Sequence, residues 1–284
     1  MSYFGELTPR MAAFREELLN AKPQVCVERA VITTRVYRER QDQPLALKRA
    51  IMLREVLAGM SIFIEPQTLI AGNQASSNRS APIFPEYAMS WVIDELDEFE
   101  RRDGDVFYIT EENKRKLREI APFWEHNTVL DRGLAAFPPH SRLYYDLGII
   151  KSEGNITSGD AHCAVNYGDM LRAGLGDYKR RAEEKLATLD LTDYRNIHKS
   201  YFYRAVVIVV DAVRAFARRY ADLAFRTAQE EPDEARRAEL LEMSRILNKV
   251  PYGPAESFRE AVQALWLTHL VLQIESNGHS LSYG

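Results

Sequence analysis

The sequence predicts a mainly α-helical protein, and three observations support this fold class. Apolar residues recur at helical spacing over most segments of the 284-residue chain. Gly and Pro, which end helices, stand between these segments. Hydrophobic residues make up 46% and charged residues 27%, which is the balance of a globular protein. No repeat, low-complexity linker or internal domain boundary is evident, so residues 1–284 are treated as one unit.

Four helices and one short extended segment are expected in the first half of the chain. Thr110 is the predicted N-cap of the fourth helix, where Glu111 and Glu112 complement the helix dipole. Two β-like runs, 61–65 and 68–71, follow the second helix and predict a small strand pair or an extended segment. The four helices are expected from about residue 26, around 53–60, over 86–100 and after 110.

The second half begins with an irregular region and continues with longer helices. Pro138 and Pro139 start the irregular region, which runs to Asp160 and contains several glycines. A helix is expected directly after Asp160. Gly174 and Gly176 lack the third glycine of a dinucleotide-binding fingerprint, so they are predicted to mark a helix end. The remaining helices are expected over 205–229, 234–248 and 258–274.

Charge and hydropathy exclude several classes of protein. A net charge of -4 and a pI of about 6.0 leave no basic field that would attract nucleic acid. Arg-rich runs at 35–40 and 214–219 alternate with apolar residues, which predicts solvated helix faces. The longest apolar run, 205–210, is far too short for a membrane span. The first twenty residues are amphipathic rather than apolar, so no signal peptide is expected and the predicted location is the cytoplasm.

Two polar segments are candidates for a functional site. A glycine-rich loop at 154–159 leads into Asp160 and His162, which are expected near a helix N-terminus. The structural alternative is that Asp160 is an N-cap and His162 a satisfied first-turn residue. The second segment is His279–Ser280, directly after the Asn277–Gly278 turn signal, with an exposed polar turn as its alternative. His162 has no cluster of partner ligands, so no metal is expected.

Three further residues are expected to be structural. His269 lies on the apolar face of the closing helix, where a hydrogen-bonded core histidine is the usual outcome. Cys26 and Glu28 stand two apart, as a thiol and a base would, but they open a helix in which Glu28 favours the dipole and Cys26 packs. With Cys163 as the second cysteine, no disulfide framework is possible; reduced thiols are expected, with a single bridge as the alternative.

Five stretches resemble the N-terminal part of glycyl radical enzymes of the pyruvate formate-lyase-like group, which includes glycerol and propanediol dehydratases. They follow the family's order over nearly the whole chain. The resemblance implies an α/β ten-stranded barrel wrapped by helices, of which residues 1–284 form the largely helical N-terminal part of the pyruvate formate-lyase-type (PFL) domain. The stretches are 22–30 (KPQVCVERA), 69–73 (LIAGN), 81–87 (APIFPEY), 153–162 (EGNITSGDAH) and 273–280 (QIESNGHS).

The resemblance also implies a radical chemistry. In this family a separate radical-SAM iron–sulfur activating enzyme makes a glycyl radical near the C-terminus, and that radical makes a thiyl on a central cysteine. The family's Cys-x-Glu loop and C-terminal glycine motif are both absent from this chain. We therefore expect no catalytic residue, bound cofactor or metal here, and no activity of the chain alone. It is expected to be a truncation, a degenerate paralogue, or a split subunit that needs a separate C-terminal portion, and the complete enzyme is expected to be a homodimer.

The substrate residues implied by the resemblance are two histidines and a serine. In the diol-dehydratase branch these map onto His162, His279 and Ser280, and Asp160 is the candidate that orients His162. The implied function is a dehydratase or C–X lyase for a small hydroxylated substrate, with a vicinal diol favoured. The alternatives are a formate C-acetyltransferase-type acyl lyase and a non-catalytic helical interaction or regulatory protein, which predicts a compact monomer or a stable complex with an unrelated partner.

Overall fold

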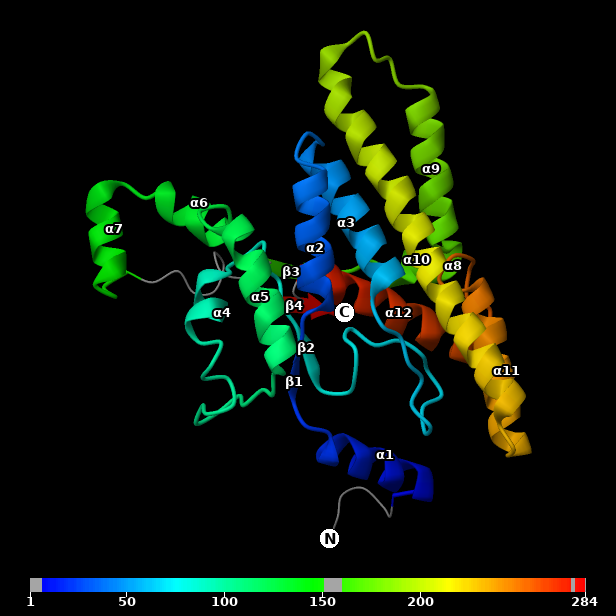
Figure 1. Ribbon diagram of the computed structural model, residues 1–284. Helices are drawn as coiled ribbons and strands as arrows, with labels where there is room; N and C mark the ends of the chain where they lie inside the picture. Colours follow the sequence, from blue (N-terminus) through cyan, green and yellow to red (C-terminus); the bar gives the residue numbers. More distant parts are fainter. Residues whose placement is uncertain (1–6, 151–159, 277–278, 284) are drawn as a thin grey trace.

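The structure, a computed structural model, describes residues 7–150, 160–276 and 279–283; for 160–163 and 279–280 only the backbone is described. Most of the described chain is helical, as predicted, and its extended segments are short (Figure 1). The helices are α1 (Pro9–Asn20), α2 (Glu28–Glu39), α3 (Leu45–Gly59), α4 (Ser90–Asp94), α5 (Glu111–Trp124), α6 (Val129–Ala135), α7 (Pro139–Asp146), α8 (Tyr167–Ala173), α9 (Leu175–Ala187), α10 (Ile197–Glu230), α11 (Glu234–Lys249) and α12 (Phe258–Ser276), with a 3₁₀ turn at Tyr194–Asn196. The strands are β1 (Gln24–Cys26), β2 (Ser80–Pro82), β3 (Asp160–Ala164) and β4 (His279–Ser282).

The four described strands form two separate parallel pairs. In the first pair Gln24 of β1 stands opposite Ser80 of β2. In the second, Asp160 of β3 stands opposite His279 of β4, and the register shifts between Asp160 and Cys163. Parallel strands cannot be joined by a tight turn, so each pair brings together segments that are distant in the sequence.

The 34-residue helix α10 organises the main core, and α3, α9 and α11 pack along it (Figure 1). Small side chains along one stripe of α10 allow its neighbours to approach closely. Phe216 and Tyr220 are fully buried within this stripe, and the Tyr220 hydroxyl donates to Oδ1 of Asn73 at 3.1 Å. The buried alanines of the stripe are Ala217, Ala221, Ala224 and Ala228.

A second core joins α2 and α5 to the β1–β2 pair. Its largest member is Trp124, which is 1% exposed and donates from Nε1 to Oγ1 of Thr34 at 2.8 Å. Thr110 accepts from the backbone N–H of Asn113, which confirms it as the N-cap of α5. A third, smaller cluster packs α8 against α11 and α12; it contains Tyr167, Met170, Ile246, Val250 and Ala264.

Gly174 ends α8 as predicted, and its conformation explains why glycine is needed there. Its φ of +75° is unfavourable for other residues. A Cβ at this position would lie 2.4 Å from the carbonyl oxygen of Tyr252. The α8–α9 corner therefore fits against the α11–α12 connection only when residue 174 has no side chain.

Of the two alternatives predicted for 61–65 and 68–71, the strand pair does not form, because these residues are irregular chain with turns. Gln263 of α12 supplies the hydrogen bonds that a partner strand would have made. Its Oε1 accepts from the N–H of Ala71 at 2.9 Å, and its Nε2 donates to the Ala71 carbonyl at 2.8 Å. A single helix side chain thus satisfies this extended backbone.

Four other predictions need correction. Within the expected helix 86–100 only α4 forms, and α7 occupies part of the region expected to be irregular. A strand, not a helix, directly follows residue 159. The Arg-rich run 214–219 is not simply a solvated face, because Arg219 donates to the carbonyls of Leu57 and of Met60 (2.7 Å) at the end of α3. Its burial there lowers the pKa of Arg219.

Candidate functional site

The four residues predicted for the site lie on one small sheet. Asp160 and His162 belong to β3, and His279 and Ser280 belong to β4. The parallel pairing places the backbone of Asp160 opposite that of His279. Their side chains lie outside the described part of the chain. The helix start expected at Asp160 is therefore wrong, and residues 279–280 lie in a strand rather than in the turn considered as the alternative, because each strand pairs with a segment that is distant in the sequence.

Helix α12 carries β4 to this sheet. Buried residues recur along the 19-residue helix, so the core fixes its direction. It ends at Ser276, and only Asn277 and Gly278 separate it from β4. Because the connection is this short, whatever fixes the C-terminal end of α12 also fixes where β4 starts.

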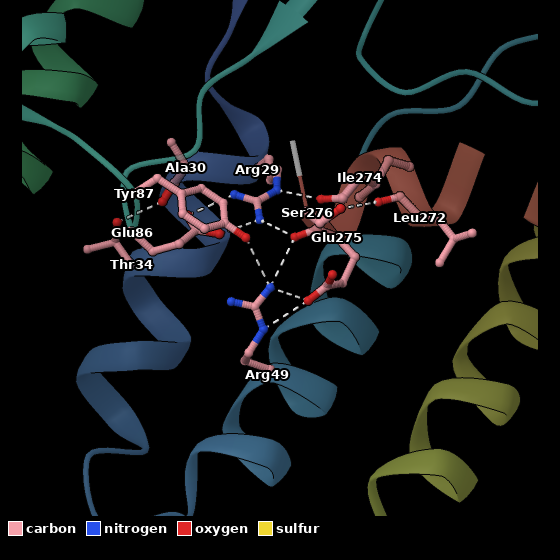
Figure 2. A network of polar contacts seen from close by, with 10 residues as sticks. All are labelled: Arg29, Ala30, Thr34, Arg49, Glu86, Tyr87, Leu272, Ile274, Glu275 and Ser276. Atoms are coloured by element: carbon pink, nitrogen blue, oxygen red, sulfur yellow. Dashed lines mark hydrogen bonds and ion pairs between the residues drawn. The ribbon is translucent and has the colours of Figure 1, made fainter. Parts of the chain in front are cut away.

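Arg29 of α2 holds the C-terminal end of α12 (Figure 2). Its Nε donates to the carbonyl of Ile274 at 2.7 Å, and its Nη2 donates to the carbonyl of Glu275 at 3.2 Å. Carbonyls in the last turn of a helix have no partner within the helix, and a cation there also complements the helix dipole. Arg29 thus satisfies two groups that would otherwise need water.

Glu86 pairs with the same guanidinium in a buried, two-bond arrangement. Nη1 and Nη2 of Arg29 donate to the two carboxylate oxygens at 3.0 and 2.5 Å. The side chains are 3% and 5% exposed. The guanidinium carbon also lies 3.7 Å from the centre of the Phe84 ring. Because a charge buried this deeply must be paired, the two residues define one geometry.

Arg49 of α3 completes the network on the solvent side. Its Nε donates to the Glu275 carboxylate at 2.9 Å, and its Nη2 donates to the Tyr87 hydroxyl at 3.2 Å. Burial lowers the pKa of Arg49, but Glu275 and Tyr87 outweigh it and raise that pKa overall. We name Arg29, Arg49, Glu86, Tyr87 and Glu275 the arginine clamp.

An aromatic stack holds the other end of the sheet. His269 of α12 stacks on Tyr283, directly after β4, with ring centres 4.1 Å apart. Tyr283 also stacks on Tyr167, whose hydroxyl lies 2.9 Å from Nδ1 of His269. The amide of Gln273 lies 3.0 Å from Nε2. We name His269, Tyr167 and Tyr283 the aromatic stack.

His269 is therefore the hydrogen-bonded core histidine that the sequence predicts. Its side chain is 8% exposed, and burial lowers its pKa, so the ring is neutral near pH 7. A neutral imidazole has one donor and one acceptor nitrogen, and Tyr167 and Gln273 occupy both. Cys26 is likewise a buried free thiol, while Glu28 accepts from the N–H of Ser61 at 2.8 Å. These contacts agree with the structural interpretation of both residues.

The arrangement is a short sheet fixed at both ends. The clamp contacts the chain just before β4 and the stack contacts it just after β4, so both ends of the strand are linked to α12. Such a frame suits polar groups that must meet a ligand in fixed positions. In the described ranges, no three His, Cys, Asp or Glu side chains gather as metal ligands. No described helix combines the length and apolar character that a membrane span needs.

The comparisons with known proteins identify this fold as that of the glycyl radical enzymes. The chain belongs to the pyruvate formate lyase-like family, whose sequence model matches residues 7–284. It is 42% identical over 279 residues to "Probable dehydratase YbiW" of Escherichia coli (strain K12), covering 98% of this chain and 34% of that protein. It is 30% identical over 281 residues to the (2S)-3-sulfopropanediol dehydratase of Klebsiella oxytoca, covering 97% of this chain and 34% of that protein.

A solved structure shares the fold closely. The glycerol-bound form of the B12-independent glycerol dehydratase from Clostridium butyricum matches with a TM-score of 0.95 and 34% identity, over 100% of this chain and 36% of that chain. The chain thus spans about a third of the length of the relatives it matches. The family and fold class predicted from the sequence are confirmed.

Sequence reasoning missed the arginine clamp. One signal was available, since the stretches 22–30, 81–87 and 273–280 that carry the family resemblance contain four members of the clamp, Arg29, Glu86, Tyr87 and Glu275. A cation such as Arg29 can be directed at a neighbouring helix end rather than at solvent. No local pattern indicated which end it would meet.

Proposed function

We propose that this chain is the N-terminal portion of a glycyl radical dehydratase or related C–X lyase, with residues 1–284 forming the first part of its PFL-type domain. The observation that carries the proposal is the pairing of β3 with β4. It joins the backbones of Asp160 and His279, two of the four residues expected to bind substrate. The same fold in a glycerol-bound glycerol dehydratase supports this choice of activity.

In this proposal, His162, His279 and Ser280 hydrogen-bond the hydroxyl groups of the substrate, and Asp160 orients His162. An unpaired buried hydroxyl costs roughly 1–3 kcal/mol, so fixed partners favour a substrate with hydroxyls in matching positions. A charged imidazole can also donate its proton to a leaving hydroxyl, which then departs as water. The glycyl radical, installed by a separate radical-SAM activating enzyme, would generate the cysteine thiyl that takes hydrogen from the substrate, and neither group belongs to residues 1–284.

The proposed substrate is a small vicinal diol or a close relative of one. Two relatives support this class by name, a glycerol dehydratase and a sulfopropanediol dehydratase. Both names denote compounds with hydroxyls on a short carbon chain. The two-histidine-and-serine set suits hydroxyls on neighbouring carbons, because each can have its own partner.

We further propose that residues 1–284 alone do not turn over substrate. The thiyl and glycyl elements of the family lie in the remaining two thirds of proteins of the relatives' length, as one chain or as a separate subunit. Large apolar side chains are exposed on separate elements, among them Phe258 (86%), Leu147 (63%) and Phe202 (60%), and we propose that the remainder of the enzyme covers part of this apolar surface. We expect a homodimer when the enzyme is complete.

Anaerobic turnover tests the proposal. Residues 1–284 are incubated with the activating enzyme, S-adenosylmethionine and glycerol or propane-1,2-diol, alone and together with the complementing C-terminal portion. We expect aldehyde formation only when both portions are present. Turnover by the chain alone would contradict the inactivity proposal, and no turnover by any activated combination on any small hydroxylated substrate would contradict the proposed function.

A further inference from the structure

We propose that Arg49 and Glu275 form a positioning pair, which sets where strand β4 begins and thereby places the backbone of His279 and Ser280. The pair does not touch substrate. It acts through the end of α12. Its consequence for ligand binding rests on the proposed function, whereas its consequence for the β3–β4 sheet rests on the geometry alone.

Only a short stretch of chain connects Glu275 to the site. Glu275 lies in the last turn of α12, and β4 starts at His279. Each residue spans at most about 3.3–3.6 Å, so the intervening chain has little slack. A shift or rotation of the last helical turn is therefore transmitted to the first residues of β4.

Arg49 fixes that last helical turn through several contacts. Its guanidinium meets both the carboxylate and the backbone carbonyl of Glu275, the latter at 3.4 Å. The same Nη2 donates to Tyr87, which lies outside α3 and α12 (Figure 2). One side chain thus links the helix end to two other parts of the fold. Planar, multi-point contacts of this kind fix orientation as well as distance.

The two ion pairs differ in solvent exposure, and this difference separates a positioning role from a stabilising one. The Arg29–Glu86 pair is almost fully buried, so its loss threatens the whole fold. Arg49 and Glu275 are instead 29% and 28% exposed, so each can be hydrated if the other is removed. Breaking this pair should therefore loosen the α12 end without unfolding the protein.

Hydrogen exchange on residues 1–284 tests the inference, with Arg49→Gln as the variant. The matched control is Arg10→Gln, because the Arg10–Glu239 pair has similar exposure, 37% and 24%, and lies on other elements. We expect at least a tenfold loss of amide protection in β3 and β4 for Arg49→Gln, with α10 unchanged, and no such loss for Arg10→Gln. A smaller loss in β4, or an equal loss in α10, would overturn the inference.

A second readout is one that a purely structural role would not move. In the activated complete enzyme, Arg49→Gln is expected to lower kcat/KM for the diol about tenfold. In the exchanged pair, Arg49→Glu with Glu275→Arg, kcat/KM for the diol is expected to recover to within threefold of that of the starting enzyme. Failure of the exchanged pair to recover any activity, with its fold intact, would count against positioning. If the unsubstituted enzyme has no activity, the proposed function fails and hydrogen exchange alone decides the positioning role.

Discussion

Replacing Glu86 by Gln tests the buried half of the arginine clamp. Gln keeps the shape of the side chain but removes its charge, so Arg29 is left as a buried cation without a counter-ion. Arg29 is 3% exposed and cannot reach water without moving α2 or the end of α12. The perturbation is therefore local in structure and large in electrostatics.

The contacts set the size of the expected effect. Breaking a buried ion pair by removing one partner costs about 3–5 kcal/mol. Two Arg29 nitrogens donate to Glu86. The Gln oxygen can still accept one of these bonds, whereas its amide nitrogen must face the other donor. We therefore expect a loss of about 3 kcal/mol, which is a large part of the roughly 5–15 kcal/mol that stabilises a typical domain.

Urea unfolding at pH 7 measures this loss, with Glu242→Gln as the control. Glu242 accepts two bonds from Arg245 at 2.7 and 2.8 Å, but this pair is 38% and 54% exposed. An exposed pair contributes about 0–1 kcal/mol, so the control should change the free energy of unfolding little. If Glu86→Gln costs no more than Glu242→Gln, burial does not strengthen the clamp and the reasoning is refuted.

Three further predictions concern two residues with shifted pKa values and one glycine with a positive φ. Burial lowers the pKa of His269, so the unfolded chain binds more protons below about pH 6.5 and the free energy of unfolding should fall from pH 7 to 5. His269→Phe should weaken this pH dependence in urea titrations. An unchanged dependence on pH would contradict the prediction. Burial, with the nearby Glu17 carboxyl, raises the pKa of Glu65 to about 7, so the stability that its protonated form contributes is complete below about pH 4.5 and is lost as pH rises through 7. Glu65→Gln should therefore raise the stability at pH 8 by about 1 kcal/mol after solvent screening. Thermal melting that shows no gain would count against this prediction. Gly174→Ala should lower the free energy of unfolding in urea by about 2–5 kcal/mol, because residue 174 has a positive φ and its Cβ would meet the Tyr252 carbonyl. Gly104 has open space around it, so Gly104→Ala should lower the free energy by less than about 1 kcal/mol. Equal losses in the two variants would refute the close approach at Gly174.

The helices could be predicted because their signals are local. The apolar stripe of 205–229 continues at helical spacing through a run of valines, and α10 forms there despite their β preference. Thr110 and Gly174 could be identified as helix boundaries, since caps depend on a few neighbouring residues. For the long helices only the extents were missed, as in α10, which begins at Ile197, whereas the short helix α7 was not predicted.

The strands could not be predicted, because their partners lie far away in sequence. β3 follows a glycine-rich stretch and contains Asp160, a common N-cap residue, so its local pattern favours a helix start. Its pairing with β4 overrides that preference. In the same way, Gln263 supports the backbone at Ala71 from another helix, where the local pattern predicted a strand pair.

The candidate site was predicted by resemblance rather than by physics. His162, His279 and Ser280 came from motif positions, and the structure places all three on β3 and β4. Of the residues that fix these strands, Arg49 and the aromatic stack, His269 included, lie outside the five stretches that carry the resemblance, and the other members of the clamp lie inside them without a role that the sequence assigned. Their role depends on which helix end or ring lies opposite, and only the fold shows that.

Dehydration by the activated complete enzyme carrying His162→Ala tests the central claim most directly. The claim is that β3 and β4 present hydroxyl-binding groups to a small diol, with His162 essential among them. We expect the unsubstituted enzyme to convert the diol to an aldehyde and the variant to lose this activity, while its glycyl radical signal in electron paramagnetic resonance remains. A variant rate within a few-fold of the unsubstituted enzyme would contradict the claim.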